Sequence, residues 1–392
     1  MTPAARVQAA IEILDQVIAA ARDNGAAADT LIARYFRDRR YAGAKDRRAV
    51  RELAYAAIRR AGERPDSGRA AMLGLAEEQP ELRASFDGSA HGPPPVDAAE
   101  KAAPAGIAPQ WLVDRLSHLP VPDRTLAAGR AALDLRVNRL KADQDAVLAA
   151  YPGSAPTAHA PDGVRLAEAV AIDAHPLFLD GSVEVQDLGS QLVALACEAT
   201  PGMLAVDLCA GAGGKALALA SAMANQGRIL GCDTDRSRLS RLSPRAARAG
   251  ATIIETMLLD PGKEAEALAA TKDSADVVLI DAPCSGTGTW RRNPEARWRL
   301  TPERLERLIA LQARLLEIGS ELVRPGGHMV YAVCSLLREE GEMQLADFLN
   351  RHQGWTPAPL PFAAGTAAGP GRLLTPSNDG TDGFFVARLA RA

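Results

Sequence analysis

The chain has 392 residues, of which 47% are hydrophobic and 24% are charged, and its formal net charge is −3 at pH 7. These values are typical of an ordinary globular protein with two or three domains. They argue against a uniformly basic nucleic-acid binder but leave room for basic patches, because phosphate binding depends on local charge.

No apolar run approaches the roughly 20 residues of a membrane span, and the N-terminus lacks the uninterrupted apolar stretch of a signal peptide. We therefore expect a cytoplasmic protein without a membrane partner. The cysteines are widely spaced and include no C-x-x-C pair, so neither a disulfide framework nor a metal site is predicted. They are Cys197, Cys209, Cys232, Cys284 and Cys334.

The first 60 residues are predicted to be helical, because Val7, Ile11, Leu14 and Ile18 recur at helical spacing. Within them, the segment 34–51 (RYFRDRRYAGAKDRRAVR) holds eight basic residues against two aspartates. It is either a solvated helix face or a phosphate-contacting patch with interleaved aromatic residues. Those aromatic residues are Tyr35, Phe36 and Tyr41.

The middle of the chain changes character twice. Residues 61–106 are rich in Ala, Gly, Pro and acids and are predicted to be partly loop or linker. Helices are expected near 107–119 and 123–133. A small α+β subdomain is predicted next, from a strand at 135–141, a helix at 143–150 and a strand-like piece at 182–187.

From Leu188 onward strands and helices alternate, which predicts a doubly wound parallel sheet. The final segment, GFFVARLA, is predicted to form an antiparallel edge strand. The five strands expected before it are 203–209, 228–233, 252–258, 276–281 and 326–335.

The loop AGAGGK joins the first of these strands to its helix. Glycine lets backbone N–H groups approach a ligand, and the helix N-terminus favours an anionic group. The loop is neither G-x-G-x-x-G nor a P-loop. Asp233 ends the second strand, 18 residues after Lys215, where ribose hydroxyls are bound in such folds. Asp260, beyond the third strand, is either a residue that reaches the adenine edge or a turn-forming aspartate before Pro261. An adenosine-containing ligand is expected, and nicotinamide and S-adenosylmethionine both remain possible at this point.

The stretch DVVLIDAPCSGTG decides between them. It places Asp281 and Cys284 at the carboxyl end of a buried strand, where open α/β sheets bind ligands. A thiol beside a carboxylate and an adenosine site suits methylation of a pyrimidine at carbon 5. A thiolate added at carbon 6 makes carbon 5 nucleophilic, and a nearby acid can hydrogen-bond ring nitrogen 3. This chemistry favours S-adenosylmethionine.

Two further features surround this stretch. Cys334 ends the fifth strand, and neighbouring strand ends lie about 5 Å apart, so both thiols are expected to face one pocket. The segment TWRRNPEARWRL carries four arginines and two tryptophans. It is either a site for unpaired nucleotides or a salt-bridged helix start.

Together these motifs resemble the Sun/Fmu family of RNA cytosine carbon-5 methyltransferases, in particular its bacterial RsmB-like branch with a NusB-like helical N-terminal domain. The similar segments are DLCAGAGGK, GCDTDRSRL, DAPCSGTGTWRRNPEARW, AVCSLLREE and DGFFVARL, with a looser likeness in KDRRAVRELAYAAIRR and LRVNRLKAD.

The resemblance implies an α/β fold. A Rossmann-like S-adenosylmethionine-dependent methyltransferase domain is expected at 189–392. It would be preceded by an all-helical NusB-like RNA-binding domain at 1–132 and by a small α+β RNA-binding subdomain at 133–188.

The resemblance also assigns residue roles by position. It makes Cys334 the nucleophile, Cys284 the cysteine that assists product release, and Asp281 the residue that activates the base. DNA cytosine methyltransferases instead use the cysteine of a Pro-Cys pair that resembles Pro283-Cys284. The implied S-adenosylmethionine site consists of Cys209, Ala210, Gly211, Ala212, Gly213, Gly214, Lys215, Asp233, Asp260 and Asp281. The chain departs from the family pattern at Ala212, usually Pro, and at Val333, usually Thr.

The expected reaction is methylation of carbon 5 of a cytosine in an unpaired region of small-subunit (16S) rRNA, through a covalent Cys–pyrimidine intermediate. Two alternatives remain: the same chemistry on tRNA, and a non-catalytic RNA-binding or ribosome-assembly factor on a methyltransferase scaffold. A monomer is expected. The base that removes the carbon-5 proton is not identified.

Overall fold

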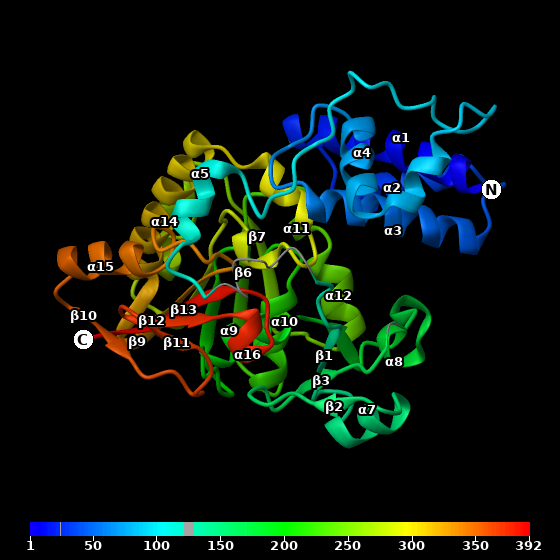
Figure 1. Ribbon diagram of the computed structural model, residues 1–392. Coiled ribbons are helices and arrows are strands. Elements are labelled where there is room, and N and C mark those ends of the chain that lie inside the picture. Colours follow the sequence, from blue (N-terminus) through cyan, green and yellow to red (C-terminus); the bar gives the residue numbers. More distant parts are fainter. Residues whose placement is uncertain (24, 121–128, 169) are drawn as a thin grey trace. The chain divides into compact units, whose positions relative to one another are not determined.

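The computed structural model describes residues 1–392 except for residue 24, residues 121–128 and residue 169 (Figure 1). Among the residues so described, no helix combines the length and the apolar character needed to cross a membrane.

The chain divides into two compact units. The helical unit consists of Met1–Arg130 together with Ser285–Arg304, and the sheet unit consists of Ala131–Cys284 together with Leu305–Ala392. Residues 285–304 thus group with the helical unit, although in sequence they lie inside the predicted C-terminal domain.

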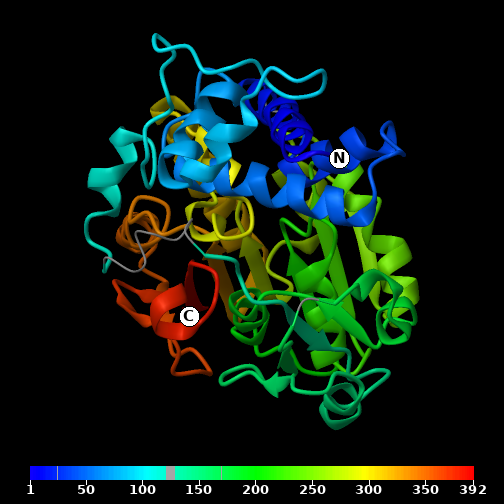
Figure 2. The same cartoon turned by 45° about the vertical axis from the view of Figure 1, so that its right-hand side comes forward.

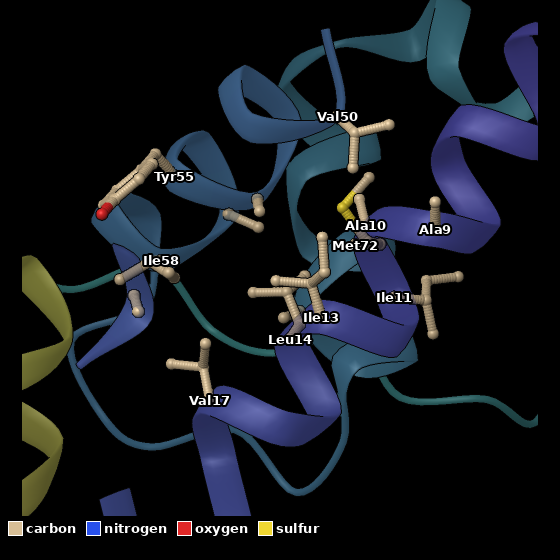
Figure 3. Close-up of a cluster of buried hydrophobic side chains, with 14 of the residues drawn as sticks. Ala9, Ala10, Ile11, Ile13, Leu14, Val17, Val50, Tyr55, Ile58 and Met72 are labelled. Atoms are coloured by element: carbon tan, nitrogen blue, oxygen red, sulfur yellow. The ribbon is translucent and has the colours of Figure 1, made fainter. Parts of the chain in front are cut away.

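The helical unit begins with the predicted helices, observed as α1 (Pro3–Arg22), α2 (Ala28–Arg37) and α3 (Ala44–Arg60). Thr2 caps α1 by accepting a hydrogen bond from the Ala5 N–H, and Pro3 occupies the first turn, where its missing N–H is tolerated. Figure 3 shows side chains of α1 close to Val50, Ile58 and Met72. The four positions singled out by helical spacing (Val7, Ile11, Leu14 and Ile18) are all buried.

Residues 61–106 contain α4 (Gly68–Glu78) and the 3₁₀ helix η1 (Pro80–Ser85), and residues 86–109 have no helix or strand. The helix predicted at 107–119 is reduced to α5 (Gln110–Val113) and η2 (Asp114–Leu116). The helix predicted at 123–133 lies mostly outside the described residues, and residues 129–133 are not helical.

A small antiparallel sheet opens the sheet unit, in the order β2-β3-β1-β4. Its strands are β1 (Asp134–Val137), β2 (Ala155–Pro156), β3 (Gly163–Arg165) and β4 (Val183–Val185). The helical pieces beside it, drawn in teal and green in Figures 1 and 2, are α7 (Gln144–Ala150), η3 (Ile172–Ala174) and α8 (Pro176–Leu179).

The large sheet has the order β11-β12-β13-β9-β8-β5-β6-β7, and β10 also pairs with β13. The run from β9 to β7 is parallel, which confirms the predicted α/β fold. The parallel strands are β5 (Leu204–Asp207), β6 (Arg228–Asp233), β7 (Ile254–Leu258), β8 (Ala275–Asp281) and β9 (Val323–Val333).

The final strand, β13 (Phe384–Arg391), is antiparallel to β9 as predicted, but the prediction of an edge strand is wrong. It lies between β9 and β12, because a hairpin of β11 (Thr366–Ala368) and β12 (Gly371–Leu374) adds to it on the other side. β10 (Trp355–Ala358) pairs with its last four residues.

Successive residues of each central strand point to opposite faces of the sheet. In β8, Val277 and Leu279 pack toward one cluster of helices, and Val278 and Ile280 pack toward the other. The first cluster contains α9 (Leu188–Leu195), α10 (Gly214–Ala222), α11 (Arg236–Leu239) and α12 (Leu242–Ala249). The second contains α14 (Pro302–Leu322) and α15 (Glu342–Arg351). The helix predicted at 236–249 is interrupted by a turn at 240–241.

The remaining elements are short. They are α13 (Glu264–Ala267), η4 (Ala269–Thr271), η5 (Thr287–Thr289), η6 (Pro294–Arg299) and α16 (Pro376–Asp379).

Candidate active site

The carboxyl ends of the parallel strands carry the candidate site. β5 lies between β6 and β8, so the chain reverses its direction of strand addition next to β5, which is where doubly wound sheets bind ligands. Three of these strands end in a carboxylate, namely Asp207, Asp233 and Asp281. The site therefore combines a predicted ligand-binding edge with a concentration of negative charge.

The glycine-rich loop crosses this edge between β5 and α10. Gly211 and Gly213 have φ values of +55° and +87°, a left-handed conformation that favours glycine. The Ala210 N–H donates to the Cys232 carbonyl, which ties the loop to β6. A side chain at Gly214 would meet nothing within 4 Å. Gly214 is the first residue of α10, so the space beside the helix N-terminus is open.

The two predicted ribose and adenine residues differ in environment. Asp233 is buried and accepts the N–H groups of Gly211 and Asp235, each at 2.7 Å. Its carboxylate therefore fixes the glycine loop as well as facing the ligand edge. Asp260 is exposed two residues beyond β7, and no hydrogen bond or ion pair in the described chain joins it to the other predicted site residues.

Lys215 and Asp281 form an ion pair across the site, with 2.6 Å between the ammonium nitrogen and Oδ2. Burial by itself lowers the pKa of Lys215, but the carboxylates of Asp281 and Asp207 outweigh that effect, so the pKa is raised and the ammonium stays charged. Cys334 is among the groups that contribute to this shift. The positive charge therefore lies near the predicted nucleophile.

The two predicted catalytic thiols lie together, as the strand order requires. The sulfur atoms of Cys284 and Cys334 are 3.3 Å apart, and both side chains are partly accessible. The other three cysteines are poor candidates for a nucleophile. Burial raises the pKa of the thiols of Cys197, Cys209 and Cys232, which disfavours their thiolate forms.

Asp207 is a site residue that the sequence reasoning missed. Both of its carboxylate oxygens are buried without a hydrogen-bond partner in the described chain. Burial and the neighbouring carboxylate of Asp281 raise its pKa to about 7, although the Lys215 ammonium lowers it in part. Its position at the end of the first strand, directly before the glycine loop, was the available signal.

In the segment TWRRNPEARWRL, two of the six side chains predicted to contact nucleotides, Arg297 and Trp298, are buried and bonded to backbone carbonyls. Arg297 is buried and donates to the carbonyls of Ile58, Arg59, Ala61 and Ile107. The indole N–H of Trp298 also donates to the Ala61 carbonyl. The interpretation of these two side chains as RNA contacts is therefore wrong, because they hold the segment within the helical unit.

In the basic segment on α2 and α3, burial separates the side chains that can contact RNA from those that cannot. Tyr35 and Phe36 are buried, so they cannot stack on a nucleotide, whereas Tyr41 is 74% exposed. Four exposed cations of this segment have neither an ion pair nor a side-chain hydrogen bond in the described chain: Arg34, Arg37, Arg40 and Lys45. Arg47 is also exposed without an ion pair, but its guanidinium donates to the Ala42 carbonyl. We call these four residues together with Tyr41 the α2–α3 patch.

Within the described residues, no group of three or more His, Cys, Asp or Glu side chains is placed to hold a metal ion.

Comparison with known proteins adds the family. A model of the 16S rRNA methyltransferase RsmB/F family matches residues 194–390, half of the chain. The chain belongs to the RsmB/F family. Ribosomal RNA small subunit methyltransferase B of Pasteurella multocida is 33% identical over 291 residues, and that of Xanthomonas campestris pv. campestris is 37% identical over 289 residues. These matches cover 72% and 74% of the chain but only 65% and 61% of the relatives' own length.

Solved structures support the same fold. PH0851 is 24% identical with a TM-score of 0.78, and the match covers 99% of both chains. A methyltransferase homologue from Pyrococcus horikoshii is 28% identical with a TM-score of 0.62, over 71% of this chain and 94% of that one. The RsmB/F match at residues 194–390 covers the large sheet, and the likeness to PH0851, which covers 99% of the chain, extends through the small sheet and the helical unit.

Proposed function

We propose that the chain transfers a methyl group from S-adenosylmethionine to carbon 5 of a cytosine in small-subunit rRNA. The observation that supports this most strongly is the pair of thiols 3.3 Å apart beside the Lys215–Asp281 ion pair, at the carboxyl edge of a methyltransferase sheet. The names of the RsmB/F relatives support the same substrate.

The residues of the glycine loop fit the cofactor. S-adenosylmethionine supplies an electrophilic methyl group on a sulfonium sulfur. The N-terminus of α10 offers backbone N–H groups to its carboxylate, and the glycine loop lets the backbone approach the ligand closely. The orphaned carboxylate of Asp207 suits its cationic amino group, because a buried acceptor without a partner is costly. Asp233 and Asp260 would bind the adenosine part.

Cys334 is the proposed nucleophile. Its thiolate forms a bond to carbon 6 of the cytosine, and the Lys215–Asp281 pair provides hydrogen bonding to ring nitrogen 3 as charge develops there. Carbon 5 would then bond to the methyl carbon as the bond from that carbon to the sulfonium sulfur breaks and the neutral thioether leaves. A base removes the carbon-5 proton, the bond from carbon 6 to the Cys334 sulfur breaks, and the thiolate is regenerated. Cys284, adjacent to Cys334, assists this last elimination.

RNA recognition is proposed to use the α2–α3 patch. Its four unpaired cations can contact phosphates, and Tyr41 offers a ring on which an unpaired base can stack. Arg297 and Trp298 play no part in this contact, since both are buried in the helical unit.

The proposal is tested by offering the protein methyl-labelled S-adenosylmethionine with 30S subunits, naked 16S rRNA or bulk tRNA, followed by nucleoside analysis. We expect label in 5-methylcytidine from a single position of 16S rRNA. If only tRNA is labelled, tRNA is the substrate and the proposed rRNA substrate is wrong. If the cofactor binds but no RNA is labelled, the chain is a non-catalytic member of the family.

A further inference from the structure

A buried chain of hydrogen bonds joins the two cysteine loops behind the reacting thiols. The side-chain amide of Gln312, on α14, donates to the Pro283 carbonyl at 2.9 Å and to the Glu340 carboxylate at 2.9 Å. The other Glu340 oxygen accepts the Ser335 hydroxyl at 2.5 Å. Pro283 immediately precedes Cys284, and Ser335 immediately follows Cys334. The path therefore runs from one cysteine loop to the other through two side chains.

The residues of this path are enclosed. Gln312, Ser335 and Glu340 each expose 0% of their surface. The hydroxyl of Tyr331 also donates to the Glu340 backbone carbonyl at 2.7 Å, which fixes the turn that carries Glu340. Because solvent cannot replace these bonds, each one lost leaves a buried polar group unsatisfied. The separation of the two loops is therefore held by specific bonds.

The Gln312 amide forms the bridge through its nitrogen and not through its oxygen. Both partners of its nitrogen, a backbone carbonyl and a carboxylate, are acceptors, so the NH₂ end must face them. The amide oxygen is left buried without a hydrogen-bond partner in the described chain. The side chain makes both bonds of the bridge through its nitrogen and leaves its oxygen without a partner in the described chain. We therefore interpret the bridge as the function of this side chain.

We propose that Gln312 and Glu340 are positioning residues that keep Cys284 and Cys334 at the separation needed for adduct release. This inference rests on the proposed function for its catalytic consequence. Its geometric part, that the bridge maintains the contact between the thiols, is independent of the reaction.

Gln312→Leu is the test, with Gln344→Leu as its matched control. Gln344, on α15, is also buried and donates one hydrogen bond at 2.6 Å to the Ile309 carbonyl on α14, but it is bonded to neither cysteine loop. Ser335→Ala, which deletes one hydroxyl beside Cys334, covers the case in which Gln312→Leu unfolds. Thermal unfolding of all three variants measures the structural cost separately.

The first readout is thiol proximity, measured by exchange with oxidised dithiothreitol. One cysteine thiolate attacks a sulfur of the reagent and breaks its S–S bond. The second thiolate then displaces the bound reagent, which leaves as the dithiol while a Cys284–Cys334 disulfide forms. We expect the disulfide, mapped by mass spectrometry at a fixed reagent ratio, to form about tenfold less readily in Gln312→Leu and as in the wild type in Gln344→Leu.

The second readout is the covalent protein–RNA adduct. Gln312→Leu should lower kcat about tenfold to a hundredfold and accumulate adduct, with KM for both substrates nearly unchanged. Equal behaviour of Gln312→Leu and Gln344→Leu in both assays would overturn the inference. If Cys284→Ala accumulates no adduct, the proposed reaction fails instead, and the exchange assay alone decides whether Gln312 positions the thiols.

Discussion

Lys215 places its ammonium 2.6 Å from the carboxylate of Asp281, so the strand that ends beside Cys284 and the helix that starts at the glycine loop share one ion pair. The pair links the proposed cofactor loop to the proposed target-base site. Lys215 also lies close enough to Cys334 for the two groups to interact electrostatically.

Removing this charge should impair the reaction more than binding. We expect Lys215→Met to lower kcat by about a hundredfold, because it removes the charged hydrogen-bond donor to the activated ring. Lys272→Met is the control, since Lys272 forms an exposed ion pair with Glu321 elsewhere in the sheet unit. Single-turnover methylation measures both variants. A Lys215→Met protein within threefold of the wild type would contradict the assignment.

Asp207 should make the stability of the cofactor-free protein depend on pH. Its pKa is raised from 3.8 to about 7 by burial and by Asp281, so the folded protein binds a proton that the unfolded chain has released. This contribution to stability is present below about pH 4 and is lost as the pH rises to about 7. Asp207→Asn should abolish it.

The measurement is the free energy of unfolding in urea at pH 5 and pH 8. The shift in pKa corresponds to roughly 4 kcal/mol, which is an upper bound on the difference that Asp207→Asn removes. An unchanged pH dependence in the variant would show that Asp207 is ionised in the folded protein across this range.

Much of the site was predictable because its residues follow a local rule. Buried apolar strands that end in Asp207, Asp233 and Asp281, each followed by a loop, place those carboxylates at one edge of a parallel sheet. The contact of Cys284 with Cys334 follows from the adjacency of β8 and β9. What a sequence does not display is pairing at long range. The Gln312–Glu340 bridge joins residues 28 positions apart, and nothing about either residue type marks it.

The failures of prediction have a similar origin. A buried arginine such as Arg297 and a phosphate-binding arginine look the same in a sequence, since only tertiary packing decides whether backbone carbonyls or water surround the guanidinium. The β11–β12 hairpin is not predicted, because its strands are only three and four residues long (TAA and GRLL) and neither shows an alternating apolar pattern. Without that hairpin, β13 was assigned to the edge.

The structural assignment of Arg297 can be tested directly. Arg297→Met should destabilise the helical unit by about 3 kcal/mol or more, because four backbone carbonyls lose a charged donor. Arg299→Met, which removes bonds to the Gly25 and Ala26 carbonyls at a more exposed position, should cost about 1 kcal/mol. Urea unfolding measures both. An Arg297→Met protein of normal stability but weakened RNA binding would restore the nucleotide-contact interpretation.

The α2–α3 patch predicts a salt effect. Arg37→Gln with Arg40→Gln should weaken RNA binding and make the slope of log K against log salt less negative by about 1.4, the value for two phosphate contacts to single-stranded RNA. Arg48→Gln with Arg51→Gln is the control, because these exposed arginines are already paired with Glu52 and Asp29. Fluorescence anisotropy at several salt concentrations gives the slopes. Equal slopes for the two double variants would remove the patch from the RNA interface.

The central claim is that Cys334 attacks the base and Cys284 releases the product. Wild type, Cys334→Ala and Cys284→Ala are incubated with methyl-labelled cofactor and 16S rRNA, and the products are separated on a denaturing gel. We expect a labelled protein–RNA adduct that accumulates in Cys284→Ala, turns over in the wild type and is absent from Cys334→Ala. An adduct formed by Cys334→Ala, or methylation by Cys334→Ala at the wild-type rate, would contradict it.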